Sequence, residues 1–170
     1  MSYCGSAARA HPQMVAVADP RAVDAVDDRC TPDAEFAALH AEFAFTVDAA
    51  ASVANARLPH FWTRLLDGLQ QPWARERVWC NPPYSQLLPW VEKATRERNP
   101  LTVMLLPANR TEQGWWQDMI EPYRDNGGEL STRFLRGRIK FIGRSVSADA
   151  RCPSQNRPPF GNVLAIWRRP

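Results

Sequence analysis

The sequence lacks any clustering of the residues that bind metal ions. Its four cysteines (Cys4, Cys30, Cys80 and Cys152) form no CxxC pair, and its three histidines are equally scattered. Zinc sites need such ligands at short, regular spacings. The sequence therefore predicts no metal site, and its widely spaced cysteines are typical of a protein from a reducing compartment such as the cytoplasm.

Long apolar stretches are also missing. No run approaches the roughly 18 consecutive apolar residues that a membrane-spanning helix requires. Residues 1–14, MSYCGSAARAHPQM, lack the apolar core of a secretory signal peptide. We therefore expect a soluble cytoplasmic protein with no membrane partner.

Acidic residues are almost absent from residues 133–170, where Asp149 is the only one. The basic residues of the same stretch are Arg133, Arg136, Arg138, Lys140, Arg144, Arg151, Arg157, Arg168 and Arg169. The whole chain has a net charge of only +3, so positive charge is concentrated at this end. This distribution indicates a polyanionic partner, although a solvated basic face gives the same pattern.

Segments typical of strands and helices alternate along most of the chain. β-prone or continuously apolar runs end at Asp48, Cys80 and Pro107, and two later ones lie at residues 132–143, with Gly137 as a plausible turn, and at residues 162–169. Helical patterns occupy residues 31–43, 87–98 and 112–123. The first helix is expected to use Thr31 as N-cap and Pro32 as its first residue. This alternation predicts an α/β fold with three layers and a mostly parallel central sheet.

The parts of the chain differ in their expected order. Residues 1–30 show no clear periodicity and are expected to form a loosely ordered N-terminal arm. Residues 31–170 are expected to fold as a single domain, a size that can bury a substantial core. Within this domain, the proline- and arginine-rich residues 144–160 are expected to form a long loop.

The strand-like run RVWC (residues 77–80) leads into an uncommon turn, Asn81-Pro82-Pro83-Tyr84. The neighbouring motifs are, in chain order, FTVDAAAS, DGL with a tryptophan after it, PWVEKA, LLPA with a tryptophan pair, and FLRGRIKF. This order, over residues 31–167, resembles the phage and prophage DNA N6-adenine methyltransferases often labelled Dam-like. The resemblance implies a Rossmann-like methyltransferase fold and the activity of a site-specific, adenine-specific DNA methyltransferase without a separate target-recognition domain.

The same resemblance implies S-adenosylmethionine as cofactor and double-stranded DNA as partner, in the cytoplasm of a bacterium or of a phage-infected host cell. It implies that Thr31 and Pro32 contact the methionine carboxylate of the cofactor. Asp48 would meet the ammonium group, and Asp67 of the DGL motif would accept a hydrogen bond from the adenine amine. The loop after Asp48 lacks the glycines that many methyltransferases have there, although its alanines still permit close approach. An alternative is that Asp48 and Asp67 are helix-cap or turn residues.

The chemistry of adenine explains why such a turn would suit the reaction. The exocyclic amine is a poor nucleophile because its lone pair is delocalised into the ring. Two acceptors aimed at its protons favour a tetrahedral nitrogen, and the Asn81 side-chain oxygen and the Pro82 carbonyl are the candidates. Pro82 and Pro83 fix the backbone that carries these acceptors. Tyr84 would stack on the target base after the base leaves the duplex.

Three of the basic residues are candidates for DNA binding. Arg136, Arg138 and Lys140 alternate in the FLRGRIKF segment. In a strand, this spacing places all three on one face, where they could contact phosphates.

Two alternatives stay open. The glycine-free loop is compatible with a DNA-binding protein of this family that no longer methylates. The NPPY turn also occurs in methyltransferases that act on RNA bases or on glutamine amides, because these substrates share a planar amine on an sp² carbon. The basic end of the chain and the order of the motifs favour DNA.

Overall fold

A computed structural model describes residues 27, 30–142, 155–156 and 158–169. The expected N-terminal arm therefore lies outside the described residues except for Asp27 and Cys30, and so does most of the expected loop at 144–160. In the described part of the chain, no helix has the length and apolar character needed to cross a membrane.

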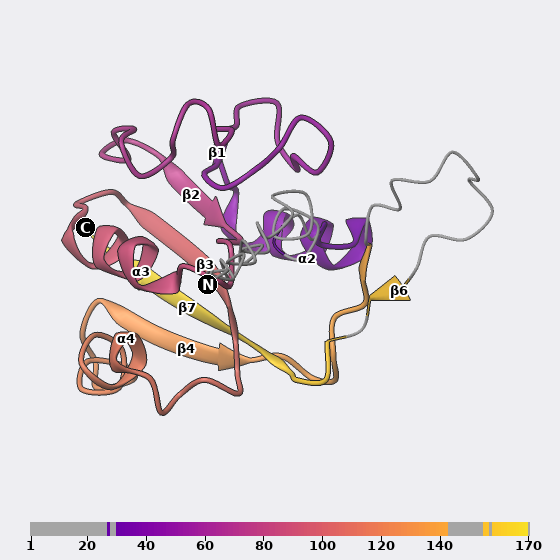
Figure 1. Cartoon of the computed structure of the whole chain (residues 1–170). Helices are drawn as coiled ribbons and strands as arrows, with labels where there is room; N and C mark the ends of the chain where they lie inside the picture. Colours follow the sequence, from indigo (N-terminus) through magenta and orange to yellow (C-terminus); the bar gives the residue numbers. More distant parts are fainter. Residues whose placement is uncertain (1–26, 28–29, 143–154, 157, 170) are drawn as a thin grey trace, which may run out of the picture.

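The core of the fold is a five-stranded sheet with the strand order β1-β2-β3-β7-β4 (Figure 1). The strands are β1 (Val47–Asp48), β2 (Arg77–Cys80), β3 (Leu101–Pro107), β7 (Asn162–Arg168) and β4 (Leu130–Phe134). β1, β2 and β3 pair in parallel, whereas β7 is antiparallel to both β3 and β4. All strands but β7 therefore point the same way, which confirms the mostly parallel sheet. Every residue of β3 is buried, as its continuous apolar run predicts for a central strand.

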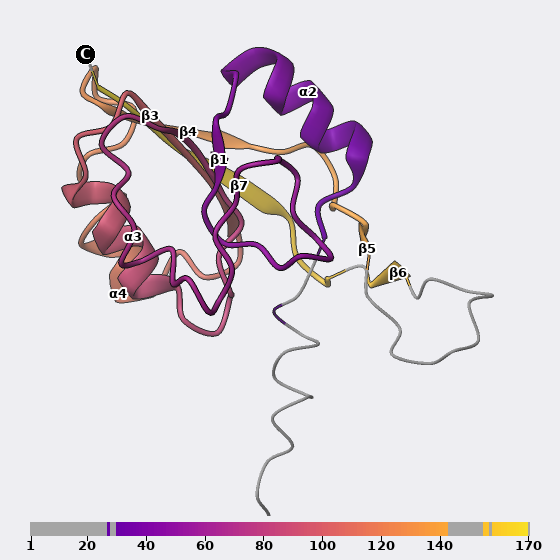
Figure 2. The same ribbon diagram turned by 90° about the horizontal axis from the view of Figure 1, so that it is seen from above.

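Helices cover both faces of this sheet (Figure 2). Helix α2 (Asp33–Phe43) lies on one face, and α3 (Leu87–Arg96) and α4 (Gly114–Gln117) lie on the other. Side chains of β3 alternate between the two layers: Val103 and Leu105 pack in the cluster of α2, and Met104 and Leu106 in that of α3 and α4. The three-layer α/β, Rossmann-like fold is thus confirmed.

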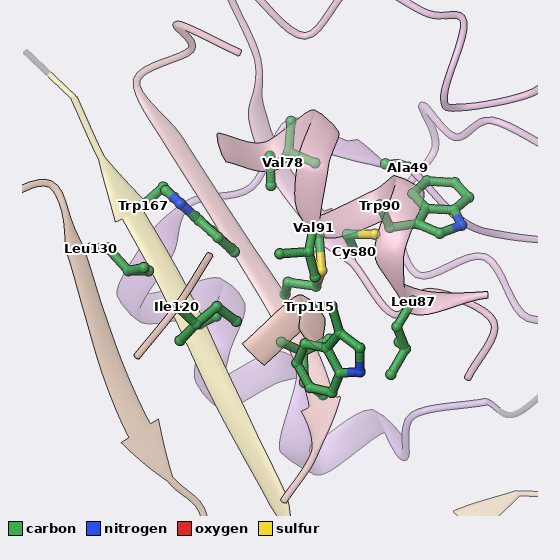
Figure 3. Close-up of a cluster of buried hydrophobic side chains, with 14 of the residues drawn as sticks. Ala49, Val78, Cys80, Leu87, Trp90, Val91, Trp115, Ile120, Leu130 and Trp167 are labelled. Atoms are coloured by element: carbon green, nitrogen blue, oxygen red, sulfur yellow. The ribbon is translucent and has the colours of Figure 1, made fainter. Parts of the chain in front are cut away.

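The cluster beneath α3 and α4 is rich in tryptophan (Figure 3). Trp90, Trp115 and Trp167 contribute to it, together with Trp116, which is 1% exposed. The paired tryptophans of the sequence are therefore core residues. Their indole N–H groups donate hydrogen bonds to the side chains of Gln113 and Glu121.

The start of helix α2 and the length of the helix expected at 112–123 differ from the sequence prediction. Helix α2 begins at Asp33, so Pro32 is its N-cap and not its first residue, and Thr31 does not cap it. Pro32 has a ψ of 150°, which is extended and not helical. The helix expected at 112–123 is reduced to α4, and hydrogen-bonded turns follow it.

The strand expected over residues 132–143 is interrupted. β4 ends at Phe134, and Gly137 adopts a φ of +77°, which favours glycine and turns the chain. A separate two-stranded sheet follows, formed by β5 (Phe141–Ile142) and β6 (Gln155–Asn156). Arg136, Arg138 and Lys140 therefore lie in an irregular connection, and the strand alternation expected to align them is wrong.

Between β1 and β2, the chain forms turns that pack against the end of β1. Residues 60–62 run beside this strand: the His60 carbonyl accepts from the Asp48 N–H at 3.0 Å, and the Trp62 N–H donates to the Asp48 carbonyl at 2.9 Å. Gly68 approaches so closely that a Cβ atom there would lie 2.0 Å from the Ala49 carbonyl oxygen. The loop after β1 has no glycine, and it is Gly68 of the DGL motif that lets another backbone segment come close to the end of β1.

Gly68→Ala is accordingly expected to destabilise the protein by at least about 1–3 kcal/mol, because backbone atoms must move to admit the methyl group. Urea unfolding measures this. Gly114→Ala is the matched control, since its Cβ would meet only the Asp118 carboxylate at 3.4 Å and alanine suits a helix. Equal unfolding midpoints for Gly68→Ala and the wild type would contradict the close approach.

Candidate active site

The ends of two adjacent parallel strands converge on one cavity. Asp48 ends β1, and Asn81 follows the last residue of β2. Both line a cavity with about 190 Å³ of space, part of it open to solvent. The other lining residues are Thr31, Ala50, Asn55, Arg57 and Trp79. Carboxyl ends of parallel strands are the usual place for ligand sites in α/β sheets.

Three lining residues carry buried polar atoms that have no hydrogen-bond partner among the described residues. They are the Thr31 hydroxyl oxygen, the Asp48 Oδ1 and the Arg57 Nε. Thr31 is 2% exposed and Asp48 is 3% exposed. An unpaired buried polar atom is costly, so three of them around one cavity indicate a polar ligand. An anionic acceptor beside a cationic donor and a hydroxyl matches the ammonium and carboxylate of an α-amino acid.

Asp48 is held in an environment that disfavours its charge. Its Oδ2 accepts a hydrogen bond of 3.0 Å from the Arg57 backbone N–H. Burial raises the pKa of the Asp48 carboxyl to about 6, although the N–H groups of Arg57 and Ala50 and the Arg57 charge oppose this shift. A cationic ligand at Oδ1 would relieve the cost of this buried charge.

Arg57 was missed at the sequence level. Its guanidinium pairs with Asp33 at the start of α2 and contacts the Cys30 sulfur, which holds its side chain over the cavity. Its only sequence signal is its position in the loop after Asp48, because the partners of its guanidinium, Asp33 and Cys30, lie more than twenty residues away along the chain.

The NPPY turn is fixed mainly through Tyr84. The Tyr84 ring is 8% exposed and packs against Phe141 and Phe160, with ring centroids 6.4 and 6.1 Å apart. Its hydroxyl oxygen accepts a 2.8 Å hydrogen bond from Asn162 Nδ2, and its carbonyl accepts one of 2.6 Å from Arg110 Nη1. These four partners come from later parts of the chain, and sequence reasoning identified none of them.

The two prolines of the turn are largely shielded from solvent. Pro82 is buried, Pro83 is half-buried, and the Pro83 carbonyl accepts from the Gln86 N–H at 3.0 Å. Burial also raises the pKa of the Cys80 thiol well above its ordinary value. Cys80 therefore stays neutral beside Asn81 and is not a nucleophile.

Asp67 is not brought into the cavity with Thr31 and Asp48. It has a φ of +50°, and its Oδ1 accepts a 3.1 Å hydrogen bond from the Leu69 N–H, as in an Asx turn. The neighbouring Gly68 packs on Ala49, so this turn lies beside the end of β1. A contact between Asp67 and a cofactor stays a prediction.

The three basic candidates lie at the surface. Arg136, Arg138 and Lys140 are all exposed in the connection between β4 and β5. Arg133, by contrast, forms a bidentate ion pair with Glu42 of α2. Within the described ranges, no group of three or more His, Cys, Asp or Glu side chains could hold a metal ion.

Two known proteins illustrate what this chain is similar to. A DNA N-6-adenine-methyltransferase of Haemophilus phage HP1 (strain HP1c1) is 31% identical over 123 residues, which cover 71% of this chain and 66% of the phage protein. The chain thus spans just under two thirds of that relative. A crystal structure of a proposed RNA methyltransferase from Pyrococcus horikoshii matches weakly, with a TM-score of 0.38 and 12% identity, over 65% of this chain and 51% of that one.

The family described as DNA N-6-adenine-methyltransferase (Dam) matches residues 21–169, which include the cavity and the NPPY turn. Because this match spans nearly the whole chain, the protein belongs to the DNA N-6-adenine-methyltransferase (Dam) family.

Proposed function

We propose that this protein transfers a methyl group from S-adenosylmethionine to the N6 amine of adenine in DNA. One observation carries the proposal: the cavity that has the unpaired polar atoms of Thr31, Asp48 and Arg57 also has Asn81 of the NPPY turn on its wall. A site for an amino-acid group thereby adjoins a site for a planar amine. Family membership supports the same chemistry.

The residues of the cavity fit the methionine end of the cofactor. Asp48 Oδ1 would accept from the ammonium group, and the Thr31 hydroxyl and Arg57 Nε would donate to the carboxylate. Pro32 sets the extended backbone that holds Thr31 in the wall. The cavity is far too small to enclose a whole nucleoside cofactor, so the adenosine end would extend beyond it, toward Asp67. When bound, the cofactor supplies the electrophilic methyl group.

The NPPY turn would hold the target amine. The Asn81 side-chain oxygen and the Pro82 carbonyl would accept its two hydrogen bonds, and Pro83 would keep both acceptors in place. Tyr84 would stack on an adenine flipped out of the duplex. The partly exposed ring of Phe160 lies beside Tyr84, with ring centroids 6.1 Å apart, and would flank the same base.

Recognition of double-stranded DNA would rest on loops of the single domain formed by residues 31–170. Arg136, Arg138 and Lys140 would contact phosphates from the connection between β4 and β5. In the double variant Arg136→Gln/Lys140→Gln, we expect the slope of log affinity against log salt to fall by about one unit for each phosphate that the protein no longer binds. Arg96→Gln, an exposed residue of α3, is the control. A slope equal to that of the wild type would assign these charges to a solvated face.

Binding of the cofactor end should release a proton near pH 6. An ammonium group requires an ionised Asp48, whose pKa burial raises to about 6. At pH 6, binding of S-adenosylhomocysteine should therefore release about half a proton, and at pH 7.5 close to none. Calorimetry in two buffers of different ionisation enthalpy measures this release. Heats at pH 6 that do not depend on the buffer would argue against Asp48 as the ammonium partner.

Methyl transfer itself is the decisive test. The protein is incubated with tritiated S-adenosylmethionine and DNA from a host without adenine methylation, and the nucleosides are then separated. Label in N6-methyladenine supports the proposal. Parallel incubations contain RNA or glutamine peptides in place of DNA, and label only in these would favour the amino-methyltransferase alternatives. DNA binding without cofactor binding would favour a protein that no longer methylates.

A further inference from the structure

We infer that Arg110 and Asp27 together hold the peptide unit between Tyr84 and Ser85 and so position Tyr84 for the reaction; this inference rests on the proposed role of the NPPY turn. Arg110 Nη1 donates to the Tyr84 carbonyl oxygen at 2.6 Å. Asp27 Oδ1 accepts from the Ser85 N–H at 3.3 Å, and its Oδ2 accepts from the Ser85 hydroxyl. A cation and an anion thus bind the two ends of one peptide dipole.

The position of this peptide unit gives the contacts their significance. Pro82 and Pro83 restrict their own φ angles, but they leave the φ and ψ of Tyr84 free. Those two dihedrals set how the peptide between residues 84 and 85 lies relative to the Tyr84 Cα–Cβ bond, from which the ring projects. Charge-assisted hydrogen bonds at both ends of the peptide fix its plane. These hydrogen bonds therefore restrain the backbone of Tyr84, the first residue that the two prolines leave free.

A third contact holds the far end of the same side chain. The Tyr84 hydroxyl accepts from Asn162 Nδ2 at the start of β7, and Asn162 is 1% exposed. Tyr84 is therefore fixed at its backbone by Arg110 and Asp27 and at its ring tip by Asn162. Arg110 follows β3, the strand next to β2, whereas Asp27 precedes α2, so three separate segments meet at this tyrosine.

Arg110 and Asp27 are positioning residues under this inference, since they act through Tyr84. Their loss should lower kcat and leave the cofactor site intact, because neither residue lines the cavity of Asp48 and Thr31. For Arg110→Ala we expect kcat to fall by about ten- to a hundredfold, as for a small misplacement of a catalytic group. The dissociation constant for S-adenosylhomocysteine should stay within about twofold of the wild type.

Three further variants separate positioning from general stability. Arg110→Lys keeps a cationic donor and should recover part of the lost kcat, although its reach and geometry differ. Asp27→Ala should also lower kcat, and the double variant Asp27→Ala/Arg110→Ala should lose less than the product of the two single effects. Residues that act on one peptide unit are not independent. Arg98→Ala removes an exposed arginine near the amino end of β3 and is the control.

The measurements are kcat and KM for DNA methylation, calorimetric binding of S-adenosylhomocysteine, and thermal unfolding. The inference fails if Arg110→Ala keeps the kcat of the wild type while Asn81→Ala is inactive; the NPPY site would then stand without this clamp. It also fails if Arg110→Lys is no better than Arg110→Ala and both lose thermal stability, since that result indicates a structural role. Full activity of Asn81→Ala would instead overturn the proposed site itself.

Discussion

Asn81→Ala is expected to abolish most methyl transfer while the protein still binds S-adenosylhomocysteine and stays folded. The substitution removes one acceptor for the adenine amine and leaves Pro82, Pro83 and the contacts of Tyr84 unchanged. By analogy with the loss of one preorganised oxyanion-hole donor, the transition state should lose about 2.7–4 kcal/mol, or roughly a hundred- to a thousandfold in kcat. The effect is large because the acceptor matters most when the nitrogen becomes tetrahedral.

The chemistry of this effect can be tested with two companion variants. Asn81→Asp keeps an acceptor oxygen at the same reach and should retain more activity than Asn81→Ala. Asn126→Ala removes an asparagine from an exposed turn outside the cavity and should methylate like the wild type. The assay is tritiated methyl transfer, with calorimetric cofactor binding in parallel. If Asn81→Ala methylates at the wild-type rate, Asn81 is not a catalytic acceptor, and the two prolines serve only to end β2.

Asp48→Asn is expected to act in opposite directions on affinity and on stability. The neutral amide cannot pair with an ammonium group, so binding of S-adenosylhomocysteine should weaken by about 2–5 kcal/mol, the range for truncating one partner of a buried charge pair. The unliganded protein, however, should become more stable. Raising the pKa of Asp48 from its ordinary value near 3.8 to about 6 costs roughly 3 kcal/mol at neutral pH, and asparagine removes that cost.

The sign of the stability effect follows from proton linkage. The folded state binds the Asp48 proton more tightly than the unfolded chain does, so the wild type loses stability as the pH rises from about 4 through about 6. The advantage of Asp48→Asn should therefore be small at pH 4 and full at pH 7.5. Urea unfolding at both pH values measures it. A variant that is less stable than the wild type at pH 7.5 would contradict the cost assigned to this buried carboxylate.

Sequence patterns predicted those parts of the fold that depend on local chemistry. The apolar run of β3 identified a central strand because burial on both faces leaves little place for polar side chains. Asp48 and Asn81 were assigned to strand ends from the residues that precede them, and they do line one cavity. Parallel neighbours end at the same edge of a sheet, so this meeting follows from the topology.

What the sequence could not indicate depends on contacts between distant segments. Arg57, Arg110 and Asn162 reach the site through partners that only the folded chain brings near. The strand expected through Arg136 failed for a different reason. Gly137 was expected as a turn within this segment and is one; pairing with β7 ends at Phe134, so the alternation of a strand does not continue to Lys140.

The place of β7 in the sheet affects how the protein folds during its synthesis. The ribosome makes β3 and β4 before β7, yet β7 lies between them and pairs with both. Until residues 162–168 emerge, the apolar strand β3 has one unpaired edge and β4 lacks its strand partner, and such edges are prone to associate with other chains. The central sheet is therefore completed only after this segment leaves the ribosome. A premature stop codon just before Asn162 would remove β7, the strand that joins β3 to β4. We expect cellular proteases to degrade such a product.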